Sequence, residues 1–238
     1  MTTTSSGARF RPEIEGLRAV AACLVMVYHV FLGRVSGGVD VFFVIAGFLI
    51  TTTLLGHVRR TGGVAPGQYL ARLAGRLVPL AALVLIVVLA AIVALMPITR
   101  MRPMLTEVAA SALYVENWAL AIQQVDYLAR GSALSPVQHF WAMSIQGQFY
   151  LLWLALFGGV AFVARRRGAD AVRGVTVLMA VLFAVSLAIS VALTESNQPL
   201  AYFHTGARMW EFAAGGLVAL AGARLARIER LPAAAGIA

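Results

Sequence analysis

Six long apolar runs constrain the fold of this chain more than any other feature of its sequence. They cover residues 17–33, 39–56, 77–97, 138–164, 175–193 and 207–223. A helix needs about 20 apolar residues to cross the hydrocarbon core of a bilayer, and these runs approach or exceed that length. Because 61% of the residues are apolar and only 12% are charged, the sequence predicts an all-α, polytopic bundle of transmembrane helices with six spans.

A further segment, residues 104–123, mixes apolar residues with acidic and amide side chains. A seventh span there would place the arginine-rich loops 57–76 and 165–173 on opposite sides of the membrane, although such loops gather on the cytoplasmic side. We therefore expect an interfacial or re-entrant helix within an extracytoplasmic cap formed by residues 98–137, and a seventh span is the alternative.

The distribution of charge along the chain is also typical of a membrane protein. The formal net charge is +9, and all 19 basic residues are arginines, grouped in short blocks between the apolar runs. This pattern is typical of cytoplasmic loops and disfavours nucleic-acid binding. It predicts cytoplasmic termini, with residues 1–10 disordered because they are rich in threonine and serine.

Two absences limit the chemistry. The sequence has no lysine, which excludes Schiff-base and lysine general-base mechanisms. Its single cysteine, Cys23, excludes an intramolecular disulfide and a cysteine zinc cluster, and we expect it to be a packed small residue. No pair of histidines or carboxylates has a convincing metal-ligand spacing, so no metal site is expected.

Arg18 and His29 lie in the first apolar run, eleven positions apart. Eleven residues bring a helix back to nearly the same face, about 16 Å further along. Ionisable groups in a membrane span often line a reaction path, so this pair suggests chemistry within the bilayer. The alternative is an arginine that reaches the membrane surface together with a packed histidine.

The sequence segments around these residues resemble those of a known family. They are Arg11–Ala19, His29, Gly37–Ile50, His139–Leu151 and Thr205–Gly215, in this order. Together they are similar to the acyltransferase 3 family of integral membrane O-acyltransferases, over most of the chain. The resemblance implies transfer of an acyl group, usually acetyl, from cytoplasmic acyl-CoA to a hydroxyl of an extracytoplasmic glycan or glycolipid. It also implies a bacterial inner-membrane protein that acts on the cell envelope and holds no bound cofactor.

The chain departs from the family pattern in three ways. Gln146 stands where the family usually has glutamate, and Gly147 where it often has a second one. The basic segment Arg72–Pro79 lacks the middle arginine of the family motif. The third departure is length, because family members have about ten spans. We therefore expect residues 11–238 to form the N-terminal part of the transmembrane domain.

The resemblance and the residue chemistry together suggest roles at the site. In the family, the residues that match Arg18 and His29 are regarded as functional. His29 is the expected base for the acceptor hydroxyl. Asp40 either orients the imidazole or caps the helix that starts beside it. Arg72 and Arg76, one helical turn apart, are the expected contacts for the CoA phosphates, with simple topology signals as the alternative.

The fourth apolar run supplies candidate acceptor-binding residues. Ser144 and Gln148 share one helix face, whereas Gln146 points elsewhere; all three are candidates for binding sugar hydroxyls or an oxyanion. His139 and Trp141 are expected to be interfacial anchors and a sugar-stacking surface. Further along, the spacing of Arg208 and Glu211 predicts a buried ion pair within one helix.

Two other functions remain open at this point. Polar residues in the first span and paired glycines also suit a transporter or flippase, although the paired broken helices typical of transporters are not visible. A non-catalytic scaffold is the other alternative, and it is favoured if Gln146 cannot be reconciled with turnover.

Overall fold

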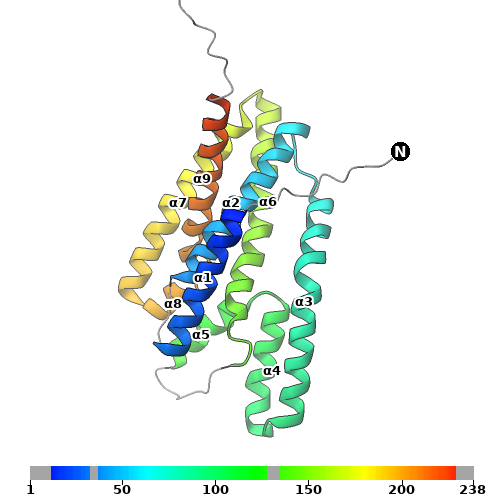
Figure 1. Ribbon diagram of the computed structural model, residues 1–238, viewed down its shortest axis with the longest axis vertical. Coiled ribbons are helices and arrows are strands. Elements are labelled where there is room, and N and C mark those ends of the chain that lie inside the picture. The colour runs from blue at the N-terminus through cyan, green and yellow to red at the C-terminus, as the bar shows by residue number, and fades with distance from the viewer. Residues whose placement is uncertain (1–11, 33–36, 128–134, 229–238) are drawn as a thin grey trace, which may run out of the picture.

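The computed structural model describes residues 12–32, 37–127 and 135–228, without the side chains of residues 29, 123–127 and 224–228. These described residues form helices joined by short turns and contain no strand (Figure 1). The helices are α1 (Pro12–Phe31), α2 (Gly38–Thr61), α3 (Pro66–Leu95), α4 (Ile98–Ala112), α5 (Glu116–Tyr127), α6 (Phe140–Arg167), α7 (Ala171–Ser196), α8 (Gln198–Phe203) and α9 (Thr205–Ile228).

Four of these helices, α2, α3, α6 and α7, are long and apolar enough to cross a membrane, within the part of the chain that was described. Each follows one of the predicted runs. The first and last predicted runs are also helical, as α1 and α9, but these two helices are not among the four. The all-α membrane fold is therefore confirmed, and the count of six spans stays a prediction.

The core lies where α9 packs between α2 and α7. Contact between α2 and α9 is close enough that a Cβ atom on Gly47 would meet the backbone of Phe212, and one on Gly215 would meet the backbone of Val44. Small residues permit such close approach between membrane helices. Beside this crossing, the ring of Phe212 stacks between those of Phe43 and Phe149, at centroid distances of 4.6 and 3.8 Å.

Two predicted boundaries were wrong. The loop expected over residues 57–76 is mostly helical, because α2 continues to Thr61 and α3 begins at Pro66. The polar and arginine residues beyond the apolar runs belong to the last turns of α2 and the first turns of α3. Pro79 is accommodated inside α3. The loop expected over 165–173 is likewise reduced to a short turn between α6 and α7.

The segment expected to be one interfacial helix, residues 104–123, is two helices. α4 ends at Ala112 and α5 starts at Glu116, and between them Tyr114 adopts a left-handed backbone conformation with φ 58°. A non-glycine residue in that region of the φ/ψ map indicates a conformation that its surroundings impose. Tyr114 packs directly against Gly147 of α6, where any larger residue would collide with its ring.

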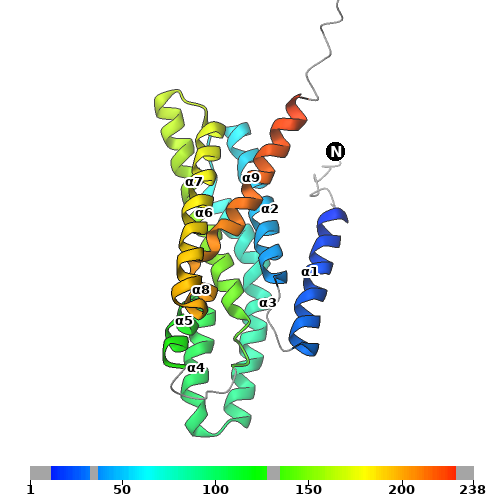
Figure 2. The ribbon, with the colours of Figure 1, turned by 90° about the vertical axis from the view of Figure 1, so that its left-hand side faces the viewer.

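The arginine-rich ends of the helices lie together. The side chain of Arg165, near the end of α6, lies 3.8 to 3.9 Å from the positions that Cβ atoms on Gly62 and Gly63 would take, in the turn after α2. Both views place these ends at the top of the bundle, whereas α4, α5 and α8 occupy the other half (Figures 1 and 2).

Helix α1 stands at the edge of the bundle and packs against α2 (Figure 2). Much of its apolar surface is exposed, including Val20, Val30 and Phe31. Cys23 is exposed as well. The expectation that Cys23 is a packed small residue was therefore wrong, because it lies on a face of α1 that no other described helix covers.

Candidate functional site

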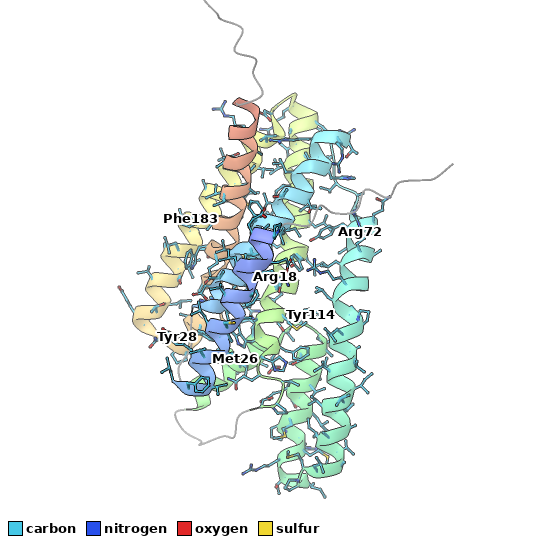
Figure 3. The ribbon with its side chains drawn as sticks, in the orientation of Figure 1. Arg18, Met26, Tyr28, Arg72, Tyr114 and Phe183 are labelled. Atoms are coloured by element: carbon cyan, nitrogen blue, oxygen red, sulfur yellow. The ribbon has the colours of Figure 1, made fainter. Side chains whose placement is uncertain are left out.

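A cavity of about 610 Å³ lies among α1, α2, α3 and α6. The arginines predicted to be functional, Arg18 on α1 and Arg72 and Arg76 on α3, all line it. Figure 3 labels Arg18 and Arg72, and shows Met26 further along α1. Segments separated by about 50 residues in sequence thus contribute guanidinium groups to one space.

The charge of this cavity is strongly positive. Arg18 has a partner in Glu15, one turn earlier on α1, at 3.1 Å, and Arg72 donates to the backbone oxygen of Gln68 at 3.1 Å. Among the described residues that line the cavity there is no aspartate or glutamate. Three guanidiniums without an acidic lining residue suit an anionic ligand with several phosphate groups.

The lining of the cavity is charged in one region and apolar in another. Toward the end of α1 where Met26 lies, its lining includes the apolar residues Val39, Phe42 and Met143. The arginines come from the earlier turns of α1 and α3. A ligand with a charged head and a less polar tail fits both regions.

On α1, the cavity-lining residues Arg18, Ala22, Val25 and Met26 follow helical spacing and form one stripe. The backbone of His29 belongs to the same helix. Its imidazole lies outside the described residues, so the role expected for His29 stays a prediction.

Gln146 and Tyr150 bring neutral polar groups into the cavity from α6. Nε2 of Gln146 donates to the hydroxyl oxygen of Tyr150 at 2.5 Å, one helical turn away. As the sequence predicted, Gln146 points away from the face that Ser144 and Gln148 share. The structure therefore places Gln146 with the arginines and the other two residues elsewhere.

Ser144 and Gln148 face α5 and the start of α9. The Ser144 hydroxyl accepts from the backbone N–H of Glu116 at 3.2 Å. Nε2 of Gln148 donates to Oδ1 of Asn117 at 2.9 Å, and its Oε1 accepts from the hydroxyl of Thr205 at 2.6 Å. These bonds join α5, α6 and α9 in a buried polar network, and neither side chain lines the cavity.

A buried carboxyl lies beside this network. Glu116 is fully buried, and burial together with the neighbouring carboxyl of Glu107 raises its pKa to about 8, an effect that the Ser111 hydroxyl partly offsets. Glu116 is thus mostly protonated at neutral pH. It stands outside the arginine-lined cavity.

Trp141 is buried, although an interfacial or sugar-stacking position was expected. Its side chain is 6% exposed and packs against Phe43, Tyr202 and Phe203. The neighbouring His139 is exposed and contacts the ring of Phe140. Trp141 therefore lies in the core, where it has no open ring face for a sugar.

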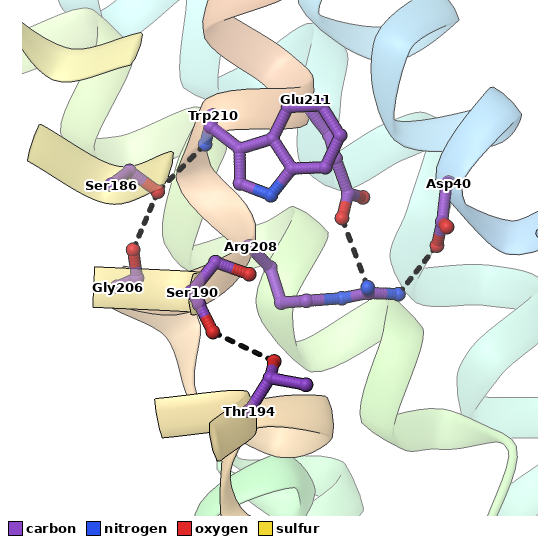
Figure 4. A network of polar contacts seen from close by, with 8 residues as sticks. All are labelled: Asp40, Ser186, Ser190, Thr194, Gly206, Arg208, Trp210 and Glu211. Carbon is purple, nitrogen blue, oxygen red and sulfur yellow. Dashed lines mark hydrogen bonds and ion pairs between the residues drawn. The ribbon is translucent and has the colours of Figure 1, made fainter. Parts of the chain in front are cut away.

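Asp40 forms an ion pair with Arg208 (Figure 4). The distance from Nη2 of Arg208 to Oδ1 of Asp40 is 2.6 Å, and Nη1 of the same guanidinium lies 3.0 Å from Oε1 of the fully buried Glu211. The predicted pair of Arg208 and Glu211 is confirmed. The N-cap residue of α2 is Gly37, and Asp40 lies in the first turn of the helix.

Aromatic rings surround this ionic cluster. The guanidinium of Arg208 lies 5.3 to 5.8 Å from the ring centroids of Phe43, Trp141 and Tyr202. Rings at this distance stabilise a cation, and two carboxylates on one arginine satisfy a charge that would be costly to bury alone. The cluster ties α2 to α9 across the bundle.

The sequence analysis missed two lining residues, Tyr69 and Tyr150. A signal for Tyr150 was present, because it follows Gln146 by four residues and shares its helix face. Tyr69 precedes Arg72 by three residues on α3, which is the same kind of signal. Within the described residues, no group of three metal-ligating side chains is found.

A family model described as an acyltransferase domain, acyltransferase 3, matches residues 11–237. The chain belongs to the acyltransferase 3 family. The resemblance noted from its motifs is thereby confirmed.

Curated relatives of this chain carry related names. An O-acetyltransferase OatA of Staphylococcus aureus is 30% identical over 217 residues, which is 89% of this chain and 34% of the relative. The peptidoglycan O-acetyltransferase OatA of Listeria monocytogenes is 33% identical over 156 residues, 64% of this chain and 25% of the relative. The chain thus spans between a quarter and about a third of the length of these relatives, and no solved structure matches it significantly.

Proposed function

We propose that the chain is the part of a membrane O-acetyltransferase that binds the acyl donor, acetyl-CoA, and presents its thioester to a carbohydrate hydroxyl. The observation that carries this proposal is the cavity lined by Arg18, Arg72 and Arg76. Its charge suits the phosphates of CoA, and its apolar end suits the pantetheine and acetyl portions. Family membership supports acyl transfer as the reaction.

The reaction needs a base, and His29 is the residue proposed for it. By helical spacing, position 29 continues the stripe formed by Arg18, Ala22, Val25 and Met26. In the proposed step, the imidazole takes the proton of the acceptor hydroxyl while that oxygen attacks the thioester carbon. The C–S bond then breaks, and the departing sulfur receives the proton from the imidazolium.

We further propose that the donor enters from the cytoplasm and that the acceptor lies outside. The arginine-rich ends of α2 and α6 lie together, and positive ends are usually cytoplasmic. This assigns the N-terminus to the cytoplasm and gives six spans in the inner membrane of a bacterium. The acceptor proposed is an envelope glycan or glycolipid, in line with the Listeria relative, whose name specifies peptidoglycan.

Replacing both cavity arginines of α3 tests the donor site. In an Arg72→Gln/Arg76→Gln variant, we expect the Michaelis constant for acetyl-CoA to rise at least about tenfold, since charge-assisted contacts of roughly 1.5 to 3 kcal/mol each are lost. The measurement is CoA release by the purified protein in the presence of an acceptor glycan.

A matched control removes the same number of charges elsewhere. Arg167→Gln/Arg173→Gln changes two exposed arginines at the α6–α7 turn, outside the cavity, and should leave the constant unchanged. An unaltered dependence on acetyl-CoA in the Arg72 and Arg76 variant would show that these arginines act only in membrane topology. Transport of a glycan without CoA release would favour a transporter instead.

A further inference from the structure

Two tyrosines, Tyr69 on α3 and Tyr150 on α6, line the arginine-rich cavity. The hydroxyl oxygen of Tyr69 is buried and has no hydrogen-bond partner among the described residues. Buried polar groups in proteins are nearly always hydrogen-bonded, so a hydroxyl of this kind at a cavity indicates a ligand that would complete its bonding. Removing that hydroxyl would break no bond within the described part of the chain.

The hydroxyl of Tyr150 accepts a hydrogen bond but donates none to a described residue. Its oxygen accepts from Nε2 of Gln146 at 2.5 Å. A phenol hydroxyl has one proton to donate in addition to accepting. Because the partner on α6 is a donor, the O–H of Tyr150 remains available for an acceptor, and no described side chain takes it.

The orientation of the Gln146 amide decides where that proton goes. Glutamine donates to Tyr150, whereas a glutamate would accept the O–H and would also add a negative charge to the cavity. The chain therefore has an arrangement in which Tyr150 donates outward, beside Arg18 and Arg76, which line the same space. Neutral donors next to guanidiniums add direction to the binding of an anion without adding charge.

We propose that Tyr69 and Tyr150 donate hydrogen bonds to phosphate oxygens of the CoA donor, beside Arg18, Arg72 and Arg76. This inference rests on the proposed function and extends it to two residues. The acceptor oxygens are anionic, and hydrogen bonds to charged groups are stronger than those between neutral groups. Both tyrosines are thus donor-binding residues.

Binding of CoA to the purified full chain tests the proposal directly, by isothermal titration in detergent. Tyr69→Phe and Tyr150→Phe should each raise the dissociation constant about tenfold, and the double variant more, because each loses a bond to a charged group. Tyr28→Phe is the matched control, since Tyr28 is exposed on α1 and does not line the cavity. Pantetheine, which lacks phosphates, should bind the variants and the unaltered chain equally.

Protein stability and the CoA affinity of the unaltered chain serve as further controls. Thermal unfolding of the Tyr69→Phe variant should match that of the unaltered chain, which separates lost binding from lost folding. Unchanged CoA affinity in both tyrosine variants would overturn the inference while leaving the proposed function intact. Failure of the unaltered chain to bind CoA would overturn the proposed function itself, and the inference with it.

An anionic lipid headgroup offers the same phosphate chemistry. Adding phosphatidylglycerol to the detergent should leave CoA affinity unchanged if the tyrosines serve CoA. Competition by phosphatidylglycerol that disappears in the two tyrosine variants would assign these hydroxyls to a lipid and would overturn the CoA assignment.

Discussion

At the scale of single residues, partners close in sequence were predictable and distant ones were not. The ion pair of Arg208 with Glu211 follows from a spacing of three on one helix. Its third member, Asp40, is 168 positions from Arg208, and only the packing of α2 against α9 brings it there. The same holds for Arg18, which lines one cavity with Arg72 and Arg76 because α1 and α3 both border it.

The base assigned to His29 gives a prediction at this scale. His29→Gln retains size and hydrogen bonding but cannot take a proton from an alcohol, so turnover should fall by about a hundredfold or more. CoA binding should persist, because the site proposed for the phosphates is at the arginine end of the cavity. Initial rates and CoA titration on the same preparation provide the measurement, and near-normal turnover would reject the assignment.

Glu116 gives a second prediction, about stability and pH. Its pKa of about 8 in the folded chain is above the ordinary value of a glutamate, 4.5. The folded state therefore holds a proton that the unfolded state releases, and the free energy of unfolding decreases as pH rises from about 4.5 to about 8. Above pH 8 the buried carboxylate is ionised and the protein is least stable.

Glu116→Gln replaces the neutral carboxyl by a neutral amide and should remove this dependence. We expect its melting temperature to exceed that of the unaltered protein by about 5 °C at pH 8.5, and to match it near pH 5. Glu195→Gln, at an exposed position of α7, is the control and should change neither value. Equal melting temperatures at both pH values would show that Glu116 is ionised in the folded state.

At the scale of helices, apolar runs predicted which segments are helical but not where the helices end. Apolar periodicity reports burial in lipid or protein, whereas a helix continues through polar residues until its backbone hydrogen bonds stop. α3 therefore begins at Pro66, eleven residues before the predicted run at 77. The break at Tyr114 had no glycine or proline to signal it, because packing against Gly147 imposes it.

The crossing of α2 and α9 gives a prediction for this scale. A methyl group at Gly215 would overlap the backbone of Val44, which cannot move without displacing α2. Gly215→Ala should therefore lower the melting temperature by roughly 5 °C or more. Gly222→Ala, on the same helix but with open space around it, should have little effect. Equal melting temperatures for the two variants would mean that α2 and α9 do not approach so closely.

At the scale of the whole molecule, sidedness could be predicted from the arginine blocks alone. The structure adds that the turn after α2 and the end of α6 are neighbours, through the approach of Arg165 to Gly62 and Gly63. The cavity could not be predicted as a volume, because it depends on how α1 and α3 stand around α2 and α6. Its arginines could be named from sequence, but its tyrosines became evident only once the helices were placed.

The last prediction concerns the orientation of the whole bundle. In a Cys23→Ser background, single cysteines at Gly63, Ala169 and Ile98 report on the α2–α3 turn, the α6–α7 turn and the start of α4. If arginine-rich ends are cytoplasmic, a membrane-impermeant maleimide should label Ile98→Cys in intact cells, and the other two only after permeabilisation. Gly63→Cys and Ala169→Cys should always behave alike, because their turns adjoin Arg165 and its neighbours. Labelling of Ala169→Cys from outside while Gly63→Cys stays protected would require an odd number of crossings between them, and it would replace the six-span arrangement with a seven-span one in which 104–123 crosses the membrane.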